Sequence, residues 1–201
     1  METNVEDASP ALETLAPQSR LKRRPRWPVA IAVIVTCLVA YNLTVWAPVA
    51  TVLGRDDRNA VTSVHVYRSW LIHPRDITVD LVAADGAATI DLTRALFQAA
   101  EALKDREFGR VILARQGKPV FMMEGAAFAQ LGQEYSSGQN PIYLIRTLPE
   151  QLYFPDGTAA FGSWTGGWLG VLGRQIEDVN SFGQIWVTGE RQTASAGQLP
   201  F

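Results

Sequence analysis

The sequence predicts an α+β fold with one transmembrane helix followed by a small mixed sheet with packed helices, because three patterns follow one another along the chain. From Pro28 to Leu53 no residue is charged, which suits a membrane-spanning helix in length and composition. After it come short segments of alternating apolar and polar residues, typical of strands, and longer ones with apolar residues three or four apart, typical of helices. The predicted division is 1–27, a disordered cytoplasmic tail with a basic flank; 28–53, the transmembrane helix; and 54–201, an extracytoplasmic α+β domain.

The basic residues beside the apolar run predict its orientation. A cluster that includes Arg23, Arg24 and Arg26 precedes the run, whereas the two arginines that follow it are offset by two aspartates. Because cytoplasmic flanks of membrane helices carry the excess of Arg and Lys, we expect the N-terminus in the cytoplasm and these arginines beside lipid headgroups. Trp27 and Trp46 are expected at the two membrane interfaces, where an indole buries its ring and keeps its N–H near water.

Two alternatives to an uncleaved anchor have less support. The apolar run is longer than the core of a signal peptide, and Ala47-Pro48-Val49-Ala50 is a poor cleavage site. Cys37, the only cysteine, lies mid-run without the small residue that precedes a lipidated cysteine. The outer domain therefore has no disulfide, and it carries no Asn-x-Ser/Thr acceptor. These features favour a bacterial inner membrane with the domain in the periplasm.

The first part of the outer domain is predicted to form two strands and then a helix. Val61–Leu71 is expected as a strand because valines alternate with polar residues, although a helix is also compatible with it. Ile77–Val82 alternates more clearly. Asp91 is expected to cap the helix, with Thr93 on its solvent side. The expected apolar face of this helix comprises Leu92, Leu96, Ala99 and Leu103.

A hairpin, a second helix and a further strand are expected next. Val111–Ala114 and Pro119–Met123 are apolar runs around a turn that contains glycine, which predicts a β-hairpin. A helix is expected with an apolar face of Phe128, Leu131 and Tyr135. Ile142–Ile145 is expected as another strand. The strands before and after the Asp91 helix are expected to pair in parallel through a right-handed crossover.

The last third of the chain joins a loop rich in glycine and tryptophan to an amphipathic helix. Apolar residues recur at helical spacing, namely Leu169, Leu172, Ile176, Val179 and Trp186, and Arg174 and Asp178 are expected to pair on the polar side. One interpretation of the loop is a docking surface, because tryptophan is enriched in binding hot spots. The candidate partner-binding residues are then Trp164, Gly166, Gly167 and Trp168. The other is a tight turn followed by close packing, with the tryptophans in the core.

No complete catalytic, metal-binding or phosphate-binding set is present in the sequence. His65 and His73 are the only histidines, and their spacing is not that of a helical zinc pair. His73 with Asp76 is the candidate for a base and an orienting carboxylate, and its ordinary interpretation is a loop histidine before a proline. The glycines after residue 161 lack the Lys-Ser/Thr pair of a phosphate loop. No catalytic residue, metal or cofactor is therefore predicted, and a formal charge of −2 excludes the basic surface that nucleic acid requires.

The layout of tail, single helix and small outer domain resembles ExbD/TolR-type energy-transducing subunits in architecture only. Those subunits use an acidic residue inside the membrane, whereas this run has none and its polar residues include Thr36, Asn42 and Thr44. Proton-driven work is therefore not expected. The leading hypothesis is a non-enzymatic, membrane-tethered periplasmic interaction or assembly subunit whose partners are the lipid bilayer and another membrane or periplasmic protein. The alternative is a membrane-anchored periplasmic enzyme or small-ligand-binding domain.

Overall fold

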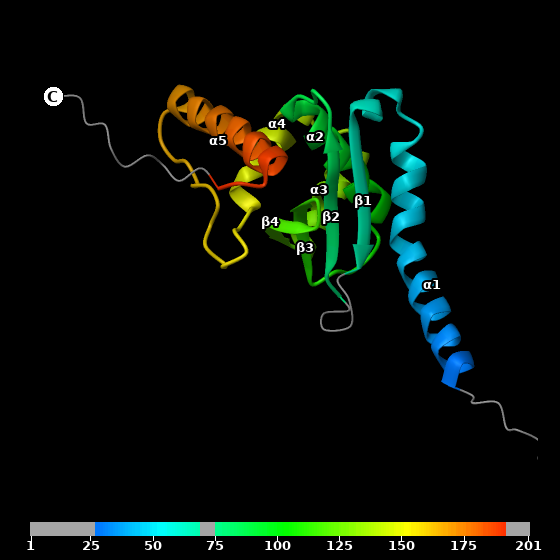
Figure 1. Ribbon diagram of the computed structural model, residues 1–201. Helices are drawn as coiled ribbons and strands as arrows, with labels where there is room; N and C mark the ends of the chain where they lie inside the picture. Colours follow the sequence, from blue (N-terminus) through cyan, green and yellow to red (C-terminus); the bar gives the residue numbers. More distant parts are fainter. Residues whose placement is uncertain (1–26, 69–74, 192–201) are drawn as a thin grey trace, which may run out of the picture.

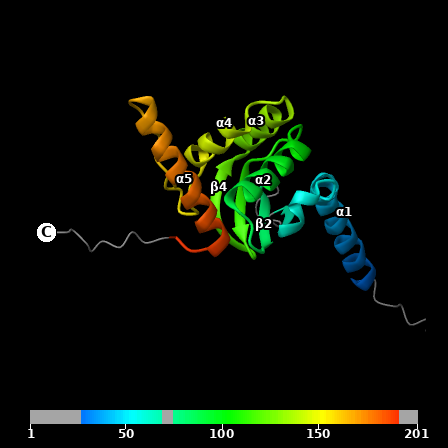
Figure 2. The same ribbon diagram turned by 90° about the horizontal axis from the view of Figure 1, so that it is seen from above.

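The computed structural model describes residues 27–68 and 75–191, and over these residues the fold is α+β (Figures 1 and 2). The α-helices are α1 (Trp27–Leu53), α2 (Thr89–Leu103), α3 (Gly125–Ser136), α4 (Pro141–Thr147) and α5 (Trp168–Thr188), and short 3-10 turns are η1 (Asp57–Val61) and η2 (Pro149–Gln151). The strands are β1 (Thr62–Arg68), β2 (Ile77–Ala84), β3 (Arg110–Arg115) and β4 (Lys118–Glu124). The predicted class is confirmed, and α1 is long and apolar enough to cross a membrane.

The four strands form one mixed sheet in the order β1-β2-β3-β4. β2 and β3 are parallel and are connected through α2, which confirms the predicted parallel pairing, while the other two pairs are antiparallel. The predicted hairpin is β3–β4. Its turn residues Gln116 and Gly117 both have positive φ, as a two-residue turn that follows the twist of the strands requires.

One face of the sheet forms the core, because apolar residues alternate along each strand. The buried residues on this face are Val66, Ile77, Val79, Leu81, Val111, Leu113, Phe121 and Met123. α2 packs over them with the predicted face of Leu92, Leu96, Ala99 and Leu103, all buried. The C-terminal half of α5 adds Phe182 and Trp186, and the indole Nε1 of Trp186 donates to the carbonyl oxygen of Ala114 at 2.9 Å.

Two glycines let helices approach α2 closely. A Cβ atom at Gly132 of α3 would collide with the backbone at Ala100, and one at Gly183 of α5 would collide with the side chain of Thr89. Any larger residue at either position would force the helices apart and open the core that they cover.

The C-terminal half of α1 belongs to the core of the domain, which the sequence prediction did not anticipate. Val45 and Val49 are fully buried against β1 and α2, while most residues from Trp27 to Tyr41 are exposed. Figure 1 shows this division, because the N-terminal half of α1 extends beyond the sheet and the C-terminal half lies beside β1. α1 is therefore one helix with two environments.

Three details of the prediction are wrong. Ile142–Ile145 is not a strand but lies in α4, where Pro141 occupies the first turn and the Asn140 side chain accepts a hydrogen bond from the backbone N–H of Ile142 at 3.0 Å. Asp91 is not the N-cap of α2, because the helix begins at Thr89 and the Asp91 carboxylate accepts from the backbone N–H of residue 88. Thr93 is buried, since α2 is enclosed by neighbouring elements on more than one side.

Candidate functional site

The N-terminal half of α5 presents large apolar side chains to solvent. Trp168 is 73% exposed, Leu169 67% and Ile176 50%, whereas Phe182 and Trp186 near the other end of the helix are fully buried. Both views show this half of α5 projecting from the side of the molecule opposite α1 (Figures 1 and 2). The helical stripe predicted from the sequence is therefore present, but only its C-terminal part packs into the core.

Trp164 is held against the polar side of α5 by two contacts. Its indole Nε1 donates to the carboxylate Oδ2 of Asp178 at 2.6 Å, and the Arg174 guanidinium lies 5.4 Å from the centre of its ring. Burial raises the pKa of the Asp178 carboxyl, and the hydrogen bond from Trp164 opposes that shift. The expected pairing of Arg174 with Asp178 is replaced by a 3.4 Å contact between Arg174 and Glu177.

The glycines before α5 provide a turn, not a close helix contact. Gly166 has φ +135°, a conformation that L side chains rarely adopt, and Gly167 is the N-cap of α5. A Cβ atom at Gly167, Gly170 or Gly173 would meet open space. The turn predicted for this loop is present, but the close packing expected to follow it is not.

Trp168, Leu169 and Ile176 expose apolar side chains along the N-terminal half of α5, whereas Trp164 contacts Asp178 and Arg174 on the other side of the helix. Trp164 is 36% exposed, so neither it nor Trp168 lies in the core. Both adjoin the glycine turn, and Leu169 and Ile176 extend the apolar area along the helix. We call Trp168, Leu169 and Ile176 the α5 patch. The sequence singled out the two tryptophans but not the exposure of the two aliphatic side chains, because periodicity does not show which part of a stripe is covered.

The candidate catalytic carboxylate has a structural partner. His73 lies outside the described residues, and Asp76 is buried with its Oδ2 2.8 Å from Nη2 of Arg110 and its Oδ1 accepting from the Arg110 backbone N–H. His65 is exposed on β1. Within 27–68 and 75–191 no cluster of three or more His, Cys, Asp or Glu is arranged to hold a metal ion.

A small cavity of about 230 Å³ near α2, α3 and α4 contains two arginines. Both guanidiniums already bind carboxylates, Arg58 to Asp56 at 2.8 Å and Arg94 to Asp91 at 2.9 Å. The hydrogen bond from Arg58 holds the pKa of Asp56 well below its usual range. These ion pairs explain the arginines structurally, and the cavity does not bring together a general acid and base.

The membrane-interface residues are divided between described and undescribed parts of the chain. Arg23, Arg24 and Arg26 lie outside the described residues. Trp27 is the first residue of α1, and Trp46 lies next to the first buried residue of its packed half; both side chains are exposed.

Comparisons with protein-family models, curated proteins and solved structures found no match, so function has to be inferred from the residues of this chain.

Proposed function

We propose that the protein is a non-enzymatic, membrane-tethered interaction or assembly subunit of a bacterial inner membrane, with its N-terminus in the cytoplasm and its α+β domain in the periplasm. The observation that supports this most is the α5 patch. Contiguous exposed tryptophan and aliphatic side chains mark binding surfaces on soluble domains. The apolar character of α1 supports attachment to a bilayer, and the basic flank before it supports the orientation.

The partner that fits the α5 patch is a protein with an apolar groove. Trp168, Leu172 and Ile176 are four residues apart and so lie along one side of α5, which suits docking of a helix into a groove. The charged residues Arg174 and Glu177, on either side of Ile176 in the chain, offer a polar rim. The tethered enzyme or ligand-binding alternative has less support, because Asp76 is bonded to Arg110.

The docking role is tested with the double variant Trp168→Ala/Leu169→Ala in the full-length chain. A photo-crosslinkable residue is placed at Ile176, and the crosslinked partner is quantified. We expect recovery to fall by about tenfold or more, since hot-spot truncation costs ~2 kcal/mol or more. The thermal midpoint should stay within about 2 °C because both side chains are exposed. Ile90→Ala, an exposed apolar residue on α2, is the matched control.

Unchanged crosslinking in the double variant would contradict docking through the α5 patch. A fall in thermal stability to the same degree as crosslinking would show instead that the tryptophan contributes to packing. The orientation is tested separately with alkaline phosphatase fused after Phe201, which should be active. Inactivity of that fusion, with activity of a cytoplasmic reporter at the same site, would reverse the proposed topology.

A further inference from the structure

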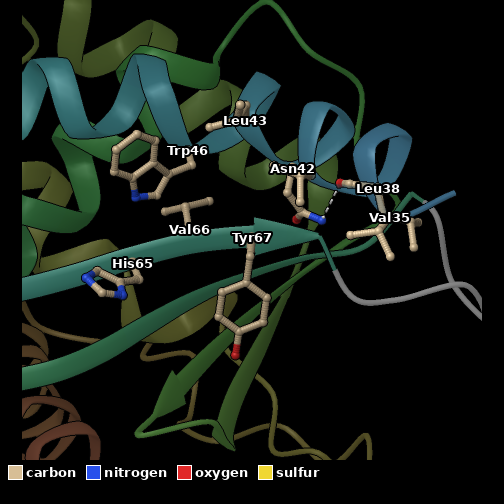
Figure 3. Close-up of a pocket in the computed structure, with 9 residues that line it drawn as sticks. Val35, Leu38, Asn42, Leu43, Trp46, His65, Val66 and Tyr67 are labelled. Atoms are coloured by element: carbon tan, nitrogen blue, oxygen red, sulfur yellow. Dashed lines mark hydrogen bonds between the residues drawn. The ribbon is translucent and has the colours of Figure 1, made fainter. Parts of the chain in front are cut away.

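A groove of about 360 Å³ runs between α1 and β1 (Figure 3). Its lining is Val35, Leu38, Val39, Asn42, Leu43, Trp46, His65, Val66 and Tyr67. The polar side chain of Asn42 is occupied within the protein, because its Nδ2 donates to the carbonyl oxygen of Leu38 at 3.2 Å and its Oδ1 accepts from the backbone N–H of Arg68 at 2.9 Å. The aliphatic side chains of α1 dominate the rest of the groove.

The position of this groove relative to a bilayer follows from the length of α1. Only Trp27 to Ile34 precedes the groove, and at 1.5 Å per residue these roughly 8 residues cover about 12 Å. A hydrocarbon core of about 30 Å needs about 20 residues, which takes the span from Trp27 to Trp46. The last turns of that span are those that face β1 across the groove. A bilayer crossed by α1 would therefore reach the groove as well.

We infer that the groove between α1 and β1 binds an acyl chain of a phospholipid from the outer leaflet of the membrane. This inference rests on the proposed insertion of α1 into a bilayer. Inside the hydrocarbon region a bound molecule must not carry unsatisfied polar groups. An acyl chain meets that requirement, whereas water or an extended peptide does not. The exposed aliphatic residues of α1 continue directly into the lining, so a chain can enter sideways from the bilayer.

The opposite end of the groove suits the polar part of the same lipid. Trp46 and His65 lie together at that end in Figure 3, and both also line an adjoining polar groove of about 390 Å³. This second groove is lined by Asp57, Asn59 and Ser63 among others and leads away from the exposed N-terminal half of α1. An indole N–H at the interface donates to headgroup or ester oxygens. The lipid is thus bound with its acyl chain beside Leu43 and its glycerol region beside Trp46.

The experiment uses the full-length chain in vesicles of phosphatidylethanolamine and phosphatidylglycerol that contain a phospholipid with a diazirine in its acyl chain. After irradiation, labelled residues are mapped by mass spectrometry. We expect label on exposed α1 residues before Tyr41 and also on Val66 or Tyr67 of β1, which line the groove. Val39→Trp, which fills the groove, should reduce β1 labelling at least about threefold. Val33→Trp is the control, because Val33 and Val39 are 56% and 54% exposed but only Val39 lines this groove.

The possible results separate this inference from the proposed anchoring. Label on α1 with none on β1 would overturn lipid binding in the groove and leave the membrane anchor supported. No label on either element would overturn both. Equal loss of β1 labelling in Val33→Trp and Val39→Trp would also overturn the groove site, because the effect would then not depend on filling it.

Discussion

Removing α1 at Gly54 should destabilise the α+β domain, although the sequence places the domain boundary there. Val45 and Val49 of α1 are fully buried in the same core as α2 and β1. A buried valine contributes about 1.5–3 kcal/mol, so the loss of both costs ~3–6 kcal/mol before the newly exposed surface of the domain is counted. The hydrogen bond between Asn42 and the backbone of Arg68 adds roughly 0.5–1.5 kcal/mol. Because a typical domain is stable by only about 5–15 kcal/mol, the fragment 54–201 should be marginal or unfolded.

The assay compares fragments 54–201 and 41–201 by urea unfolding in the same mild detergent, followed by circular dichroism. We expect the midpoint of 54–201 to be lower by about 1 M or more, since m for a small domain is about 1–3 kcal/mol/M. Within 41–201, Val49→Ala should cost about 1.5–2.5 kcal/mol through lost burial and a residual cavity, whereas Thr51→Ala, on an exposed side of α1, should change stability by less than about 0.5 kcal/mol. Equal midpoints of the two fragments would refute the assignment of α1 to the core.

Three further predictions follow from single contacts. Leu96→Asp should unfold the domain, since an unpaired buried charge costs several kcal/mol, while Ile90→Asp on the exposed side of α2 should be mild; equal melting temperatures would contradict this. Asn42→Leu should accelerate amide hydrogen exchange at the last residue of β1, and unchanged exchange would show that its hydrogen bond is unimportant. Burial raises the pKa of the Asp178 carboxyl, and this shift stabilises the folded state fully below the pKa of the unfolded chain; the stabilisation is lost as pH rises through the pKa of the folded state. The Trp164 indole N–H resonance should therefore titrate above pH 3.8, and it should not titrate with Asp178→Asn.

The elements with strong periodicity could be predicted from the sequence, because their side chains meet one environment along their whole length. Ile77–Val82 alternates apolar and polar side chains with Ile77, Val79 and Leu81 on the core face, and the Asp91 helix has an apolar stripe that packs throughout. Ile142–Ile145 was mistaken for a strand because a run of four apolar residues has no distinguishing period. The decisive signal was instead the Asn140-Pro141 pair, which is a helix start.

The candidate site shows a different limit of sequence reasoning. Leu169 and Trp186 belong to the same apolar stripe of α5, yet the first is 67% exposed and the second is fully buried. Which part of a stripe is covered depends on where neighbouring elements end, and this is tertiary information. The same holds for α1, where Val33 and Val45 are the same residue in the same apolar run but only Val45 packs against β1 and α2. Asn42 carried a signal, because an amide in an apolar run needs a partner.

The shared use of α1 bears on how the domain would work in a membrane. A domain connected to its anchor by a flexible linker samples many orientations, whereas here the anchor helix continues without a break into the core. The Asn42 side chain also fixes the end of β1 to α1, so the domain cannot rotate freely about the helix. If α1 spans a bilayer, the α5 patch is then held on the side away from the anchor, in one direction relative to the membrane. Fixed presentation lowers the entropy cost of docking with a partner anchored in the same membrane, which favours an assembly role over capture of a freely diffusing ligand.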